Sequence, residues 1–225
     1  MVRLPTRLEC AVREALKAAA RGMALVAISP SLASFGVRRM FLGRNRALEG
    51  STEMLSLIPG MPGYYLRRAF LSCVLERCAN SATVHFGTLF SQTGARLDEN
   101  VYVGPRCHLG LVHLEKDVLL GAGVHIPSGG ATHGADDVDR PIGEQPGART
   151  LVRIGEGTWV GSRAIVMADV GTHCVIGAGA VVTRPIPDYS VAAGVPARVI
   201  RTRRPSSPGA PRRGSVRRFD GSRGL

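Results

Sequence analysis

An aliphatic residue recurs every six positions over much of residues 97–182 of this 225-residue chain. The period is kept in four successive runs, namely Leu97, Val103 and Leu109; Leu114, Leu120 and Ile126; Ile154, Val160 and Val166; and Val170, Ile176 and Val182. A glycine often follows the aliphatic residue, and a small or β-branched residue often lies four positions on. A period of six differs from the periods of an α-helix and of an ordinary strand. It is typical of a parallel β-helix made of hexapeptides.

This periodicity predicts an all-β solenoid in which three hexapeptides form one triangular coil. The first residue of each hexapeptide and the residue four positions on should point inward, and the last residue should point outward. About twelve hexapeptides predict roughly four coils, and 84–91 adds an irregular first coil. Aromatic residues are only 5% of the chain and 28 residues are glycine, which suits a core of stacked aliphatic side chains with many tight turns.

Residues 1–83 precede the repeat and form a helical or irregular region. Apolar residues at helical spacing predict a helix over 6–21, a second over 46–58, and a third that begins at Pro62. We expect Arg67 to lie off the apolar face of the third helix.

The uncharged stretch 22–37 is interpreted as a buried or membrane-surface segment. A secretory signal is the less favoured alternative, because the 21 residues that precede the stretch are long for a signal and contain Glu9 and Glu14. Five cysteines without a CxxC pair fit a reducing compartment, so we expect a cytoplasmic protein.

The net charge of +12 lies at the two ends of the chain. Residues 1–46 carry nine basic and two acidic side chains, residues 201–225 carry eight and one, and 47–200 therefore carry −2. Residues 202–225 have no periodic apolar face and are predicted to be a disordered Arg-rich tail. An inert solvating role is favoured for this tail, and peripheral contact of the basic ends with the inner membrane surface is the alternative. Specific nucleic-acid binding is not expected, because aromatic residues are almost absent from the tail.

The hexapeptides VGPRCH, LGAGVH, IGEGTW, VGSRAI and IGAGAV resemble those of the left-handed β-helix acyltransferases. The stretch from TWVGSRAIV to GVPARVIR resembles the last coils of that family's sugar O-acetyltransferases, and the preceding helices are similar to those of the colanic-acid type. The resemblance covers 84–201. It implies a left-handed coil, a homotrimer, and transfer of acetyl from acetyl-CoA to a sugar, polysaccharide-precursor or lipid-linked sugar hydroxyl, without a metal.

Residues 128–150 interrupt the repeat with a polar, Gly-rich loop. Such an insertion on a rigid solenoid is where binding loops are expected. By resemblance to the family's essential histidine, His133 is the candidate general base, since imidazole accepts protons near neutral pH. Glu144 and Asp139 are candidates for orienting it.

The resemblance also assigns eight residues to acetyl-CoA, which are Trp159, Gly161, Ser162, Ala178, Thr183, Arg184, Arg198 and Arg201. Ser162 would offer its main-chain N–H to the thioester carbonyl, and Ala178 would contact the pantetheine arm. Arg198 and Arg201 would bind the CoA phosphates.

Two other readings are left open. One is a zinc hydratase of the left-handed β-helix carbonic anhydrase type that uses His108 and His113, with His85 as a third ligand. The other is acetylation of a small acceptor such as serine. An acetyl-cysteine intermediate is not expected, because Cys107 and Cys174 occupy inward positions where a small thiol serves packing.

Overall fold

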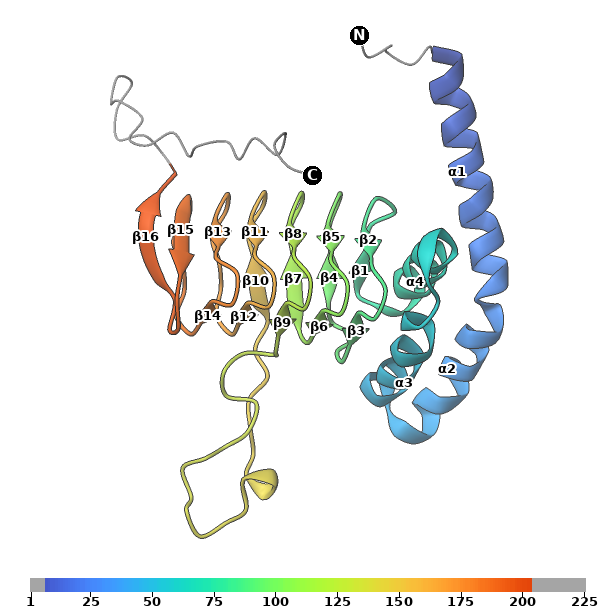
Figure 1. The fold of residues 1–225 in the computed structure, drawn as a ribbon. Coiled ribbons are helices and arrows are strands. Elements are labelled where there is room, and N and C mark those ends of the chain that lie inside the picture. Colours follow the sequence, from blue (N-terminus) through green and yellow to red (C-terminus); the bar gives the residue numbers. More distant parts are fainter. Residues whose placement is uncertain (1–6, 204–225) are drawn as a thin grey trace, which may run out of the picture.

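The computed structural model describes residues 7–203, and the predicted tail beyond them lies outside that range. Within it, helices precede a triangular solenoid (Figure 1). The helices are α1 (Arg7–Ala27), α2 (Ser29–Leu42), α3 (Arg44–Ser56) and α4 (Gly60–Val74). Three of them correspond to the predicted helices, and α2 covers most of the uncharged stretch.

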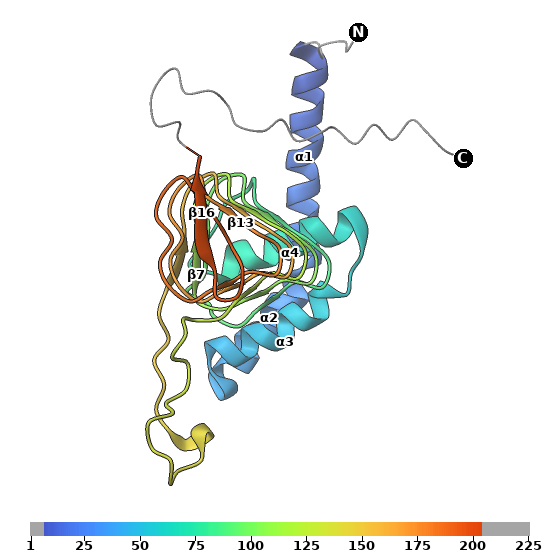
Figure 2. The same cartoon turned by 60° about the vertical axis from the view of Figure 1, so that its left-hand side comes forward.

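The solenoid strands form three sheets that run along its three sides (Figure 2). Sheet A contains β1 (Arg77–Cys78), β4 (Arg96–Leu97), β7 (Val112–Leu114) and β10 (Val152–Ile154). Sheet B contains β2 (Thr83–Val84), β5 (Tyr102–Val103), β8 (Leu119–Leu120), β11 (Trp159–Val160), β13 (Val175–Ile176), β15 (Ser190–Ala193) and the antiparallel β16 (Arg198–Thr202). Sheet C contains β3 (Leu89–Phe90), β6 (His108–Leu109), β9 (His125–Ile126), β12 (Ile165–Val166) and β14 (Val181–Val182).

The predicted left-handed β-helix is confirmed, with about six turns rather than four. Its first strand, β1, begins at Arg77, before the expected start at residue 84. The additional coils lie at the two ends of the repeat, where an aliphatic residue followed by glycine no longer recurs regularly. They pair in register with their neighbours all the same, as Arg77 does with Arg96.

The core is a stack of aliphatic side chains in columns. On sheet B, Val84, Val103, Leu120 and Val160 follow one another in register and are fully buried. Burying one such side chain contributes roughly 1.5–3 kcal/mol. The inward positions predicted from the six-residue period are therefore the positions that hold the coils together.

Helices α3 and α4 cover the open end of the first coil, and α1 and α2 pack outside them (Figure 1). Arg67 of α4 is 3% exposed, so the prediction that it lies off the apolar face was wrong. Its Nε donates to the Val84 carbonyl at 3.0 Å and its Nη1 to the Ile58 carbonyl at 2.7 Å. The guanidinium thus satisfies backbone oxygens at the helix–coil junction, and burial lowers its pKa.

Candidate functional site

Four of the predicted acetyl-CoA residues lie together where the chain turns from sheet B to sheet C. Trp159, Gly161 and Ser162 belong to one coil, and Ala178 lies at the same corner of the next. Trp159 is half exposed, at 52%. The Gly179 N–H donates to the Ser162 carbonyl at 2.9 Å, which joins the two coils at this point.

The main-chain N–H groups of Ser162 and Ala178 are available to a ligand. Within residues 7–203, neither group donates a hydrogen bond, whereas the N–H of Gly161, which precedes Ser162, donates to the Ile176 carbonyl at 2.8 Å. Both residues are exposed. A Cβ at Gly161 would lie 2.5 Å from the Ala178 nitrogen, so only glycine fits under this donor. Two unbonded N–H groups on neighbouring coils can hold a carbonyl or an oxyanion.

A surface hollow of about 360 Å³ adjoins Ser162, and its lining is Phe86, Pro105, Arg106, Ala122, Gly123, Ser162 and Arg163. Arg106 and Arg163 have left-handed backbone conformations, with φ of 58° and 59°, at equivalent turns. No ion pair of either side chain is formed with the rest of the described chain. These two cations were not predicted from the sequence, because a single arginine in a turn carries no motif.

The remaining predicted acetyl-CoA residues are more widely spread. Arg198 begins β16 opposite Ala193, at the end of sheet B that leads to the Ser162 corner, and Arg201 lies opposite Val191. Both arginines are exposed. Thr183 and Arg184 are also exposed, but they follow β14 and lie at the corner between sheets C and A. One chain therefore does not bring all eight residues to a single corner.

The predicted loop leaves the solenoid after β9 and returns at β10, and it projects well away from the coils (Figure 1). Its two limbs pair with each other, since the Thr150 N–H donates to the Ser128 carbonyl at 2.9 Å and the Ala148 N–H to the Ala131 carbonyl at 2.7 Å. His133 follows this paired segment and is exposed. An exposed imidazole on a projecting loop can reach a substrate held by another surface.

Gln145 organises the end of the loop. It is buried, accepts from the Asp137 N–H at 3.1 Å, and donates to the carbonyls of Asp137 at 2.7 Å and Arg140 at 2.9 Å. This role of Gln145 was not predicted from the sequence. A glutamine in a polar loop gives no sign of being buried until its hydrogen-bond partners are known.

Neither proposed carboxylate partner of His133 contacts it among the described residues. Asp139 donates its N–H to Asp137 Oδ1 at 3.0 Å, and Glu144 accepts at its carbonyl from Arg140 Nη2 at 3.2 Å. Both side chains are exposed. Their orienting role remains a prediction for the assembled site.

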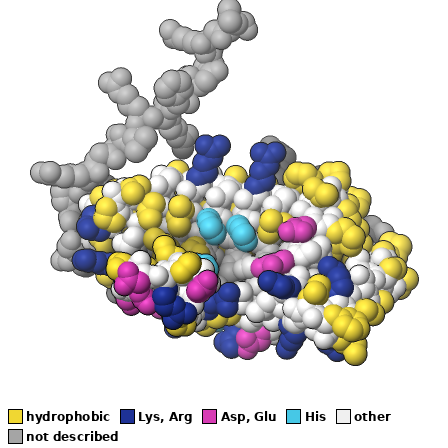
Figure 3. Space-filling view, turned by 90° about the horizontal axis from the view of Figure 1, so that it is seen from below, with side chains coloured by type: hydrophobic (Ala, Val, Ile, Leu, Met, Phe, Trp, Pro, Cys, Tyr) yellow, Lys and Arg dark blue, Asp and Glu magenta, His cyan; other side chains and the backbone are white. Residues whose placement is uncertain are grey.

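The three histidines of the zinc alternative lie on three different sides of one chain. His108 is on sheet C, stacked on His125 with ring centroids 5.1 Å apart, and Figure 3 shows adjacent histidines on this face. His113 is on sheet A, and His85 lies between the rings of Tyr64 and Tyr102. Within residues 7–203 no group of three metal-binding side chains is formed. A single chain does not assemble the zinc ligand set.

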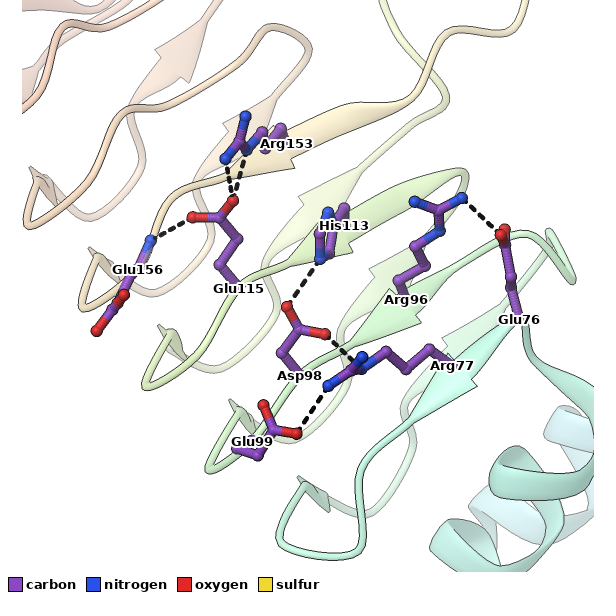
Figure 4. A network of polar contacts seen from close by, with 9 residues as sticks. All are labelled: Glu76, Arg77, Arg96, Asp98, Glu99, His113, Glu115, Arg153 and Glu156. Atoms are coloured by element: carbon purple, nitrogen blue, oxygen red, sulfur yellow. Dashed lines mark hydrogen bonds and ion pairs between the residues drawn. The ribbon is translucent and has the colours of Figure 1, made fainter.

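His113 belongs to a ladder of ion pairs on sheet A (Figure 4). Its Nε2 lies 2.9 Å from Asp98 Oδ2, and the same carboxylate accepts from Arg77 Nε at 2.7 Å. Arg96 and Glu76 form a further pair at 2.5 Å. The paired register of the strands, which joins Arg96 to His113, brings these charges together. The ladder gives His113 a structural partner.

Both inward thiols are packing groups, as predicted. Cys107 is 1% exposed and Cys174 is fully buried. Burial raises the pKa of Cys107 to about 11 and raises that of Cys174. A thiol with a raised pKa is a poor nucleophile at neutral pH, so these residues are not suited to carrying an acetyl group.

Comparisons with known proteins agree with this architecture. Residues 152–184 match the bacterial transferase hexapeptide (six repeats) family. The putative lipopolysaccharide biosynthesis O-acetyl transferase WbbJ of Escherichia coli is 31% identical over 145 residues, which are 54% of this chain and 73% of that protein. The probable acetyltransferase Rv3034c of Mycobacterium tuberculosis is 44% identical over 73 residues, which are 32% of this chain and only 24% of that protein.

Solved structures show the same fold. A maltose O-acetyltransferase from Clostridium difficile superposes with a TM-score of 0.62 at 23% identity, over 71% of this chain and 86% of that chain. A galactoside acetyltransferase in complex with coenzyme A superposes with a TM-score of 0.56 at 21% identity, over 76% and 83% of the two chains.

Proposed function

Because this chain belongs to the hexapeptide family of bacterial transferases, we propose that it moves the acetyl group of acetyl-CoA to a hydroxyl of a sugar or polysaccharide precursor. The observation that carries the proposal is the pair of unbonded N–H groups of Ser162 and Ala178. Both residues are exposed, and Ser162 lines a hollow that also contains two arginines. The N–H groups suit a thioester whose carbonyl needs hydrogen-bond donors, and the two arginines add positive charge beside them.

The reaction is a direct transfer within a ternary complex. The acceptor oxygen attacks the thioester carbonyl carbon while His133 takes the hydroxyl proton. The Ser162 N–H stabilises the tetrahedral oxyanion, and a donor of this kind contributes about 2.7–4 kcal/mol. The C–S bond then breaks, the acetyl ester is released, and the CoA thiolate takes the proton from His133, which restores the base. Arg198 and Arg201 hold the CoA phosphates at the last coil.

The active enzyme is proposed to be a homotrimer. The loop is rooted where sheet C meets sheet A, whereas Ser162 lies where sheet B meets sheet C. His133 of one subunit would therefore complete the corner of its neighbour, and three subunits would form three such sites. Light scattering tests this assembly, and a stable, active monomer would contradict it.

The acceptor class rests on the names of two of the similar proteins, a putative lipopolysaccharide biosynthesis O-acetyl transferase and a maltose O-acetyltransferase. We place the enzyme in the cytoplasm, as the cysteine pattern suggests, with its basic ends in peripheral contact with the inner membrane surface.

An acceptor screen tests the proposal. The full chain is incubated with acetyl-CoA and, separately, with free sugars, nucleotide-linked sugars, lipid-linked sugars and serine, and released CoA thiol is measured. We expect a sugar product that gains one acetyl group and loses it to hydroxylamine, as an ester does. Turnover with serine alone, or an amide product that resists hydroxylamine, would contradict the sugar O-acetyl assignment.

A further inference from the structure

Helices α1 and α2 expose an unbroken apolar stripe on the side opposite to their buried residues. The buried side contains Ala24, Ile28 and Phe35, which pack toward α3 and α4. The outward side, here called the outer stripe, follows the helical spacing through Val26, Pro30, Ala33, Val37, Met40 and Phe41, and all six residues are exposed. The side chains of Met40 and Phe41 are 78% and 80% exposed.

The outer stripe lies at the end of the molecule farthest from β16. Figure 1 shows α1 and α2 as the outermost layer, and Figure 3 shows hydrophobic side chains gathered at the same helical end. Exposed apolar surface of this extent on a helix pair marks an interaction site.

The charges around the outer stripe have one sign. Between Glu14 and Glu49 the sequence contains no acidic residue, while it contains six basic ones. Three exposed arginines lie near Met40 and Phe41 in the sequence. Arg39 precedes Met40, and Arg44 and Arg46 follow Phe41. An apolar helical face with a cationic border is suited to the interface of an anionic bilayer, where side chains enter the acyl region and cations meet headgroups.

We propose that the outer stripe docks the enzyme on an anionic lipid surface. A second copy of this chain is a poorer occupant, because joining two such faces would bring the same positive charges together. Among the described helices none is long and apolar enough alone to cross a membrane, and the segments Ala18–Ala27 and Ser29–Leu42 meet that test only as a pair bent by 47°. The outer stripe would be the surface that makes the peripheral membrane contact, and lipid binding through it does not depend on the acetyl transfer.

Vesicle sedimentation tests the inference with the full chain. Vesicles of phosphatidylcholine alone and of phosphatidylcholine with phosphatidylglycerol are compared at low and high salt. We expect binding only to the anionic vesicles, with loss at high salt. Phe41→Ser should weaken that binding by about tenfold, the equivalent of one buried aromatic side chain. Arg44→Gln should weaken it by about fivefold.

The matched control is Ile200→Gln, which removes another exposed apolar side chain, 64% exposed against 80% for Phe41, at the opposite end of the molecule. It should bind vesicles as the wild type does. Acetyl-CoA turnover with a water-soluble acceptor is measured for every variant, so that a failure of binding and a failure of the reaction are told apart. Equal binding by wild type and Phe41→Ser, or no binding to anionic vesicles, would overturn the inference. A change of oligomeric state in Phe41→Ser would instead assign the stripe to a second copy.

Discussion

The main-chain nitrogen of Ser162 lies so close above Gly121 that a Cβ at position 121 would be 2.7 Å from it. The position of the proposed oxyanion donor is thus set by a glycine on the preceding coil. Gly121→Ala should push Ser162 outward and lower kcat by about 10²-fold, the usual cost of losing one such donor. Steady-state kinetics check this. Gly36→Ala is the control. Nothing lies within 4 Å of the Cβ that this substitution adds, so the variant should keep wild-type kcat. Equal kcat in both variants would contradict the role of Ser162.

Two adjacent leucines test the account of the core. Leu120 is fully buried in the sheet B column, whereas its neighbour Leu119 is 42% exposed. Leu120→Ala should lower the free energy of unfolding by about 2–5 kcal/mol through lost burial and a cavity. Leu119→Ala should cost far less. Denaturant unfolding of both variants measures the difference, and equal losses would mean that the column does not stabilise the coils.

Arg198 should act on cofactor affinity rather than on the chemical step. Arg198→Ala should raise KM for acetyl-CoA by about tenfold, the equivalent of one charged hydrogen bond, and leave kcat nearly unchanged. Arg96→Ala, which breaks an ion pair on sheet A, serves as the control and should leave KM unchanged. A fall in kcat at unchanged KM for Arg198→Ala would place the residue elsewhere in the mechanism.

The stacked histidines of sheet C should make the protein less stable in acid. Burial, and secondarily the neighbouring His108, lowers the pKa of His125. Below its ordinary pKa of about 6.5, the unfolded chain binds a proton that the folded chain still resists, so stability falls as the pH falls through this window. Thermal unfolding near pH 7.5 and near pH 5.5 measures the loss. This loss of thermal stability should be smaller in His125→Gln. An unchanged loss would show that the stacked histidines do not contribute to the acid sensitivity.

The solenoid could be predicted because its determinants are local. Each coil repeats the same inward positions within six residues. The burial of Leu97 and Leu120 can therefore be predicted without knowledge of distant contacts. The first coil was partly missed because the chain near Arg77 lacks the glycine that follows the aliphatic residue elsewhere. Its pairing becomes visible only once Arg96 lies beside it.

The fold of one chain brings some of the predicted site residues together and leaves others apart, and the reason is again one of range. The corner around Ser162 follows from the repeat, since residues at equivalent turns stack. Gln145 and the buried Arg67 depend on carbonyl oxygens that only the folded chain presents to them, such as that of Val84. A carboxylate partner of His133 remains a prediction, because among the described residues neither Asp139 nor Glu144 contacts it.

His133→Ala tests the central claim, that a loop histidine removes the acceptor proton while the solenoid corner holds the thioester. His133 is exposed on the loop, so its loss should leave thermal stability and acetyl-CoA binding near wild type. His108→Ala, an exposed histidine on the solenoid itself, is the matched control and should keep most of the activity.

The deciding measurement is kcat for acetyl transfer by these two variants, with acetyl-CoA affinity measured in parallel. The account predicts a fall of about 10²–10⁴-fold for His133→Ala, the contribution of a positioned general base, at unchanged affinity. Near wild-type kcat in His133→Ala, together with loss of activity in His108→Ala, would contradict the account and place the chemistry on the solenoid face.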